Sequence, residues 1–229
     1  EGGYIGGIFR DRGVGRNLTG FDALTFWAKA STTASFGTVG FGVDFEESKY
    51  ETSVSNLQLS TGWKKYVIPI PDPSKLNKER GLFIFAAGTE STNGQGYTIW
   101  IDELRFEKLG NNNLLYPYML DGQDLTVSGF IGSNQVLGNL GAVFNLSNGQ
   151  NISVNAAPSY FNFNSSNPAV TSPFELNNFG QMTTQIIGSS GTALVTAQID
   201  GLGLTNQSLQ LVEGDTIARV SIVAATASG

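Results

Sequence analysis

Turn-forming residues interrupt this chain at short intervals, and that spacing restricts its fold more than any other feature. The 229 residues include 29 glycines and 7 prolines, and few segments repeat with the helical period. Between the turns, apolar and polar residues alternate as they do in strands, where successive side chains point to opposite faces of a sheet. The sequence therefore predicts an all-β fold.

The predicted strand over residues 96–107 is the clearest of these runs, and it carries an acid among apolar residues. Strict alternation places Asp102 between Trp100 and Leu104 on the more apolar face. An unpartnered buried carboxylate is costly. We therefore expect Asp102 to be buried, and either hydrogen-bonded to the backbone or paired with an arginine.

A polar, turn-forming run at Gly110–Asn113 predicts a boundary between two domains, residues 1–110 and 111–229. Neither Lys nor Trp occurs beyond this run. The second part contains several short strands separated by turns, a pattern typical of an immunoglobulin-like sandwich. We expect these strands at 125–131, 136–146, 152–156, 160–164, 180–187, 193–199 and 208–212.

An exposed indole is expected on the predicted strand 21–30. The even-numbered residues from position 24 are apolar and are assigned to the core, so Trp27 and Lys29 lie together on the opposite face. If the following strand is its neighbour, Gly40 and Gly42 leave a shallow groove beside Trp27. The alternative is that Trp27 packs beneath a loop or against the second domain.

Composition excludes several function classes. The net charge is -6 and the pI is about 4.6, which argues against nucleic acid or an anionic membrane as a partner. The chain has no cysteine and no histidine, so disulfides, thiolate nucleophiles and imidazole catalysis are excluded. No apolar stretch is long enough to span a membrane as a helix.

Both halves resemble known families. The first half, through residues 21–30, 63–70 and 97–106, resembles the galactose-binding-like jelly rolls that serve as carbohydrate-binding modules. The second, through residues 163–170 and 191–197, resembles bacterial immunoglobulin-like repeats, although Phe163 stands where a tryptophan is common. The resemblance implies a β-sandwich jelly roll followed by an Ig-like β-sandwich. Such pairs look like accessory regions of secreted or cell-surface glycan-processing proteins of Bacteroidetes-type bacteria.

This resemblance implies an extracellular or cell-surface module that binds a polysaccharide, β-glucan-like or another plant or algal glycan, with the Ig-like domain as a spacer. Its partners would be the glycan and other proteins of the same system. Asp102 matches the position where related jelly rolls place a ligand of a structural Ca²⁺ ion. A sugar ring stacks its C–H face on an indole while charged neighbours bond its hydroxyls. The predicted binding residues are Trp27, Lys29, Arg10, Asp44 and Tyr50.

Several readings remain open beside this one. Each of the charged candidates is also consistent with an ordinary solvated surface residue, and Trp63 and Trp100 are expected in the core. Asp44–Glu47 supplies adjacent acids, but glycoside hydrolysis needs two carboxylates held across a cleft, so we expect no catalysis. The alternatives are a structural or adhesive surface protein, or the accessory region of a glycoside hydrolase whose catalytic domain lies outside this chain.

Overall fold

The structure, a computed structural model, describes residues 3–199 and 218–224 and confirms the all-β prediction. The chain divides into two compact units, Glu1–Asn113 with Phe144–Ala157 and Leu114–Val143 with Pro158–Gly229. Strands β8 (Asn113–Tyr118) and β11 (Gly141–Asn145) lie at the points where the chain passes between the units.

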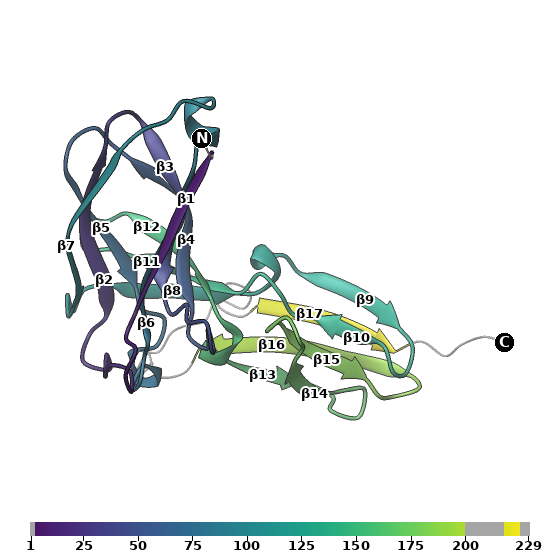
Figure 1. Cartoon of the computed structure of the whole chain (residues 1–229). Coiled ribbons are helices and arrows are strands. Elements are labelled where there is room, and N and C mark those ends of the chain that lie inside the picture. The colour runs from purple at the N-terminus through teal and green to yellow at the C-terminus, as the bar shows by residue number, and fades with distance from the viewer. Residues whose placement is uncertain (1–2, 200–217, 225–229) are drawn as a thin grey trace. The chain divides into compact units, whose positions relative to one another are not determined.

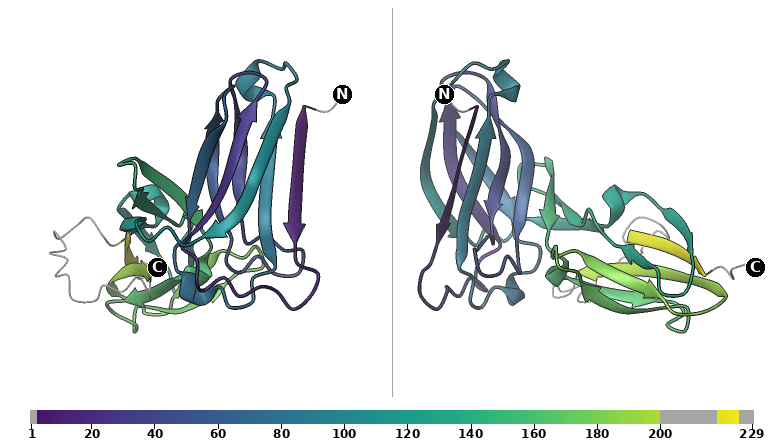
Figure 2. Two further views of the ribbon diagram at one scale, coloured as in Figure 1. Left: turned by 90° about the vertical axis from the view of Figure 1, so that its left-hand side faces the viewer. Right: turned by 45° about the vertical axis from the view of Figure 1, so that its right-hand side comes forward.

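The first unit is a β-sandwich of two facing sheets (Figures 1 and 2). One sheet has the order β5-β2-β7, and the strands of the other sheet that lie wholly in this unit have the order β1-β6-β3-β4-β12. Two single-turn 3-10 helices, η1 (Pro73–Lys75) and η2 (Glu90–Thr92), lie in its loops. The strands are β1 (Tyr4–Arg10), β2 (Ala23–Ala30), β3 (Ala34–Phe41), β4 (Thr52–Leu59), β5 (Lys64–Pro69), β6 (Gly81–Gly88), β7 (Ile99–Glu107) and β12 (Asn151–Ala156).

Aromatic side chains from both sheets form the core of this sandwich. The ring centroid of Phe26 on β2 lies 6.2 Å from that of Phe36 on β3 and 5.7 Å from that of Phe83 on β6. Phe26 also stacks on Tyr66 of β5, with centroids 5.5 Å apart. The predicted core residues of β2 are confirmed, because Leu24, Phe26, Ala28 and Ala30 are all at most 2% exposed.

Strand β7 corrects the prediction of a buried Asp102. Thr25 pairs with Arg105 while Trp27 pairs with Asp102, so three residues of β7 span the distance that two span on β2. This is a β-bulge, with Glu103 at φ 49°, and it reverses which face of the sheet each later residue occupies. Asp102 is therefore exposed.

The predicted groove formed by two glycines is also wrong. Strand β3 belongs to the opposite sheet, so it is not a neighbour of β2. A Cβ atom on Gly40 would clash with the carbonyl oxygen of Thr52, so this glycine allows close approach of β4 and leaves no open space. Gly42 has φ +84° and ends the alternation of β3, which leaves Asp44 buried and Phe45 76% exposed.

The first unit includes a segment that the sequence analysis assigned to the second domain. Strand β12 pairs antiparallel with β4, with Asn155 opposite Ser53 and Ala156 opposite Thr52. The predicted division at residue 110 therefore differs from the observed one, because residues 144–157 belong to the first unit. Sequence alternation identifies a strand but not the sheet that it joins.

The second unit is built from two sheets, β10-β15-β14 and β13-β16-β17-β9. Its strand pairs are antiparallel except for β9 with β17, which is parallel. Strand β14 was not predicted from the sequence, and the strand predicted at 208–212 lies outside the described residues. The elements are β9 (Leu125–Gly129), β10 (Asn134–Val136), β13 (Phe161–Ser165), β14 (Thr171–Leu176), β15 (Met182–Ile186), β16 (Gly191–Ile199) and β17 (Ala218–Ala224), with η3 (Leu120–Gly122) and η4 (Pro158–Tyr160).

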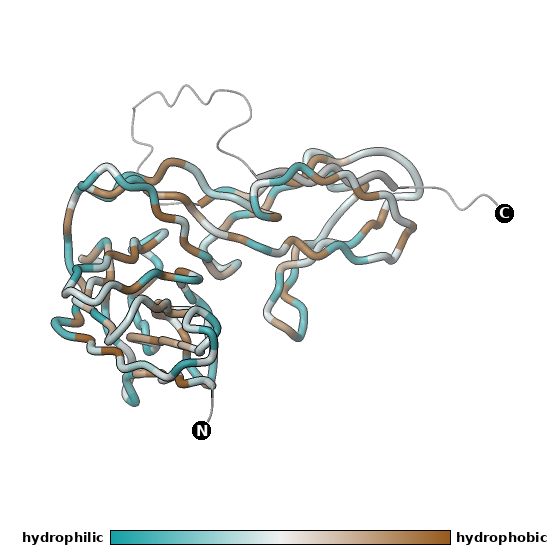
Figure 3. Tube along the Cα trace, turned by 90° about the horizontal axis from the view of Figure 1, so that it is seen from above, coloured by the Kyte–Doolittle hydropathy of each residue, from teal (hydrophilic) through white to brown (hydrophobic). Residues whose placement is uncertain are grey.

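Hydrophobic and hydrophilic residues alternate along the chain of both units, as Figure 3 shows. Buried apolar side chains of the second unit include Tyr160, Val195 and Ala197. In the part of the chain that the structure describes, no helix is long and apolar enough to cross a membrane.

Candidate functional site

The outer face of the β5-β2-β7 sheet carries all three tryptophans of the chain. Lys29 on β2 pairs with Trp100 on β7, and on its other side Trp63 directly precedes β5. The Lys29 ammonium lies 5.0 Å from the ring centroid of each indole. A cation this close to an aromatic ring is attracted by the negative ring face. Lys29 therefore links two indoles across the three strands.

A second row of residues lies beside the first on the same face. Trp27 is two residues before Lys29 on β2, and its side chain therefore projects to the same side of the sheet. Trp27 is flanked by Lys65 on β5 and by Asp102 on β7, both directly opposite it in the register. We call the surface formed by Trp27, Lys29, Trp63, Lys65, Trp100 and Asp102 the tryptophan face.

The indoles of this face are open to solvent. Trp27 is 36% exposed, Trp63 45% and Trp100 43%. The expectation that Trp63 and Trp100 are core residues is therefore wrong, whereas Trp27 is exposed as predicted. A cluster of large exposed aromatic side chains is informative in a way that a single one is not, because extended apolar patches mark binding surfaces.

The sequence contained a signal for Trp63 that was missed. Tyr66, Ile68 and Ile70 alternate along this segment, and their burial shows that they form its core face. Alternation from these residues places Lys65 and Trp63 on the outer face. For Trp100, the sequence pattern was misleading. Strict alternation puts Trp100 on the same face as the half-buried Phe106, but the bulge at Glu103 lies between them and places them on opposite faces.

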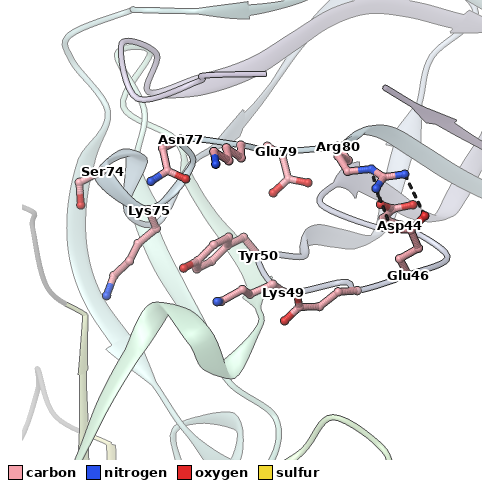
Figure 4. Close-up of a pocket in the computed structure, with 11 residues that line it drawn as sticks. Asp44, Glu46, Lys49, Tyr50, Ser74, Lys75, Asn77, Glu79 and Arg80 are labelled. Atoms are coloured by element: carbon pink, nitrogen blue, oxygen red, sulfur yellow. Dashed lines mark hydrogen bonds and ion pairs between the residues drawn. The ribbon is translucent and has the colours of Figure 1, made fainter. Parts of the chain in front are cut away.

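Of the other predicted binding residues, Asp44 and Tyr50 lie in loops of the first unit and line a cleft of about 680 Å³, whereas Arg10 ends strand β1 and contacts Asp44. Figure 4 shows the side chains that line the cleft, with Asp44 and Arg80 at one end and Ser74 and Lys75 at the other. We call this the arginine cleft. Its lining residues are Asp44, Glu46, Glu47, Lys49, Tyr50, Ser74, Lys75, Asn77, Lys78, Glu79 and Arg80.

Charges at the Arg80 end of the arginine cleft are already paired. Asp44, whose side chain is 4% exposed, contacts Arg10 Nη1 at 2.6 Å and Arg80 Nε at 3.0 Å. Arg80 also forms a two-pronged contact with Glu46, at 2.7 Å and 3.2 Å. The hydrogen bond from Arg10 holds the pKa of Asp44 below its usual value, in spite of burial. Asp44 is therefore a fixed anion.

Glu79 is the second acid near this end, and its environment is different. The side chain is buried, and its Oε1 accepts a hydrogen bond of 2.8 Å from the backbone nitrogen of Gly81. Burial raises the pKa of Glu79, and the nearby Asp44 charge raises it further. The cleft is therefore lined by two acids whose pKa values are shifted in opposite directions. Asp44 forms ion pairs with two guanidinium groups, whereas Glu79 accepts a hydrogen bond from the backbone.

The predicted binding residues therefore divide into two groups. Trp27 and Lys29 lie on the tryptophan face. Arg10 and Asp44 form an ion pair near the cleft, where the Arg10 guanidinium also lies 5.0 Å from the centroid of the exposed Phe45 ring. Tyr50 lines the cleft, and its ring centroid is 5.7 Å from the Lys49 ammonium.

Asp102 does not lie in a cluster of potential metal ligands. Across residues 3–199 and 218–224, no three Asp, Glu, His or Cys side chains gather in a way that could hold an ion. One oxygen of Asp102 accepts a hydrogen bond of 2.7 Å from the backbone nitrogen of Glu103, within the bulge. A calcium ion prefers several oxygen ligands together. The calcium site stays a prediction from the family resemblance.

The chain matches no protein-family profile, and no curated protein is significantly similar to it in sequence.

Proposed function

We propose that the first unit binds a polysaccharide without breaking its bonds, and that the tryptophan face is the binding surface. The observation that carries this proposal is the exposure of Trp27, Trp63 and Trp100 on one face of one sheet. Exposed indoles cost solvation free energy that a stacked sugar ring recovers, because the C–H face of a pyranose is apolar.

The polar residues of the face complement this aromatic surface. Lys29 and Lys65 offer ammonium donors on either side of Trp27, and Asp102 offers a carboxylate acceptor. Aromatic surface with a few placed polar groups is the general composition of a small-molecule site. A flat sheet face buries less of its ligand than a pocket does, so a modest affinity is expected for one site.

The proposed role is non-catalytic because of how the acids are held. Glycoside hydrolysis uses two carboxylates across the scissile bond, one of which acts as acid and one as base or nucleophile. On the tryptophan face Asp102 lies beside indoles and lysines. In the arginine cleft Asp44 is bound by two arginines, which lowers its basicity. Binding would then concentrate a partner protein on the glycan, at the cell surface or outside the cell, with the second unit as a spacer.

Isothermal titration calorimetry of the whole chain against soluble laminarin, xylan and mannan tests this proposal. We expect a saturable heat with at least one glycan, and a loss of that heat in the Trp27→Ala variant. The Tyr50→Phe variant is the matched control, because Tyr50 is an aromatic residue of the arginine cleft. Normal binding by Trp27→Ala together with loss in Tyr50→Phe would move the site to the cleft. No heat with any glycan would contradict the proposal.

A further inference from the structure

Two opposite charges of the tryptophan face have no ionic partner. Within the part of the chain that the structure describes, Lys29 and Asp102 take part in no ion pair, with each other or with another residue. The Lys29 ammonium contacts two indole rings, and Asp102 accepts a hydrogen bond from the backbone of Glu103. Both side chains therefore keep hydrogen-bonding capacity for a ligand.

The remaining charges on this side of the sheet are paired with one another. Lys65 Nζ lies 2.6 Å from Glu107 Oε2, and Arg105 lies 2.5 Å from Glu103 and 3.9 Å from Glu107. Glu107 also accepts a hydrogen bond from the hydroxyl of Thr25 at 2.8 Å. Among the described residues of the tryptophan face, the charges without an ionic partner are thus one cation, Lys29, and one anion, Asp102.

These two residues are diagonal neighbours across β2 and β7. Asp102 is opposite Trp27, and Trp100 is opposite Lys29, so the indole of Trp27 stands next to both charged residues. Diagonal neighbours in an antiparallel pair have their Cα atoms about 7–8 Å apart. A group placed over Trp27 therefore has a donor and an acceptor within its reach.

A hydroxyl group fits this pair because it donates one hydrogen bond and accepts others. It accepts from the Lys29 ammonium and donates to the Asp102 carboxylate, and hydrogen bonds to ionised groups are the stronger ones. A uronate or sulfate group in the same place would be attracted by Lys29 but repelled by the Asp102 carboxylate, a repulsion that an uncharged hydroxyl does not meet. The net charge of -6 adds to that repulsion.

We infer that the tryptophan face selects an uncharged glycan, and that Asp102 is a specificity-determining residue that accepts a sugar hydroxyl. This inference rests on the proposed function and deepens it. It also gives Asp102 a role that needs no metal ion.

The test is affinity electrophoresis in gels that contain either a neutral or an anionic polysaccharide. Laminarin, xylan and mannan form the neutral set, and polygalacturonate, alginate and carrageenan form the anionic set. We expect retardation by a neutral glycan alone, with an affinity that is unchanged between about 0.02 and 0.3 M salt, because no net charge is neutralised on binding. EDTA should leave the retardation unchanged.

Three variants separate the roles of the charges. Asp102→Asn keeps the oxygen that accepts from Glu103, so the bulge is retained, and it should weaken neutral-glycan binding about tenfold. Lys29→Met keeps an apolar stem between the indoles and should weaken binding to a similar extent. Glu47→Gln is the control, because it removes an exposed acid of the arginine cleft and should change nothing.

The outcomes distinguish this inference from the proposed function. Retardation by an anionic glycan that weakens with salt would overturn the inference while the proposed function stands. So would full neutral-glycan binding by Asp102→Asn and Lys29→Met, or a loss of wild-type binding in EDTA. No retardation by either set would contradict the proposed function itself, and the inference with it.

Discussion

The tryptophan face and the Arg80 end of the arginine cleft belong to the same unit but differ in whether the charged groups at their centre have ionic partners. In the cleft, Asp44 is bound by Arg10 and Arg80 and is almost fully buried. On the face, Lys29 and Asp102 lie among exposed indoles and have no ionic partner in the part of the chain that the structure describes. If concave shape alone decided, the cleft would be the binding site. The charged side chains that lack an ionic partner favour the flat face instead. Substitutions in the two regions should therefore affect different properties.

The largest expected effect on binding comes from the Trp63→Ala, Trp100→Ala double variant. It removes both indoles that contact Lys29, and we expect glycan affinity to fall about 100-fold, or about 3 kcal/mol. Both side chains are more than 40% exposed, so the free energy of unfolding should change by only about 0.5 kcal/mol for each. Calorimetry and urea unfolding measure the two quantities. A large loss of stability with unchanged glycan affinity would show that these indoles have a structural role and do not bind the glycan.

The largest expected effect on stability comes from the opposite region, in the Asp44→Asn variant. Removing this buried anion leaves Arg10 and Arg80 without their shared partner, which is strongly destabilising. We expect the thermal midpoint to fall by several degrees, while glycan affinity of the folded protein is unchanged. The pKa of Asp44 is lower in the folded state than in the unfolded state. The ionised Asp44 therefore stabilises the fold fully above the ordinary pKa of an aspartate, and this stabilisation is lost as the pH falls through the folded-state pKa.

A smaller effect of opposite sign is expected for Glu79→Gln. Burial raises the pKa of Glu79, so the folded state binds its proton more readily than the unfolded state, and ionisation destabilises the fold as pH rises. Glutamine can accept the same hydrogen bond from Gly81 without a charge. The variant should be modestly more stable than wild type at neutral pH, and this difference should vanish below the ordinary pKa of a glutamate. Urea unfolding as a function of pH measures it; a difference that grows in acid would contradict the assigned shift.

The smallest effect is expected for Lys65→Met, which breaks the pair with Glu107. This ion pair is partly exposed, and such pairs contribute about 0.5 kcal/mol or less. The hydrogen bond from Lys65 lowers the pKa of Glu107, so any contribution should disappear in acid as Glu107 protonates. A loss of stability comparable with that of Asp44→Asn would show that the two regions do not differ in the proposed way.

Much of the first unit could be predicted from local sequence pattern. Alternation placed Leu24, Phe26 and Ala28 in the core and Trp27 outside it, because a regular strand has a period of two. The same rule failed at β7, where one extra residue at the bulge reverses the pattern, and it placed Asp102 in the core. Period-two reasoning holds only between irregularities, and the bulge at Glu103 was not apparent from the residue types.

Pairing between distant strands was the part that local pattern could not supply. The groove predicted beside Trp27 needed β3 next to β2, but β7 and β5 occupy those positions. Likewise, Arg10 and Asp44 were placed with Trp27 on residue type alone, whereas their charges attract one another across 34 residues of sequence. Neighbour identity depends on long-range topology, which composition and periodicity do not encode.

The most direct test of the central claim uses the chain's own fluorescence. All three tryptophans lie on the proposed binding face, so intrinsic emission excited at the indole band reports on that surface alone. If the tryptophan face binds a neutral glycan, saturating titration should shift the emission to shorter wavelength and protect it from iodide quenching. Saturable binding in calorimetry with unchanged emission and unchanged quenching would place the ligand elsewhere and contradict the account.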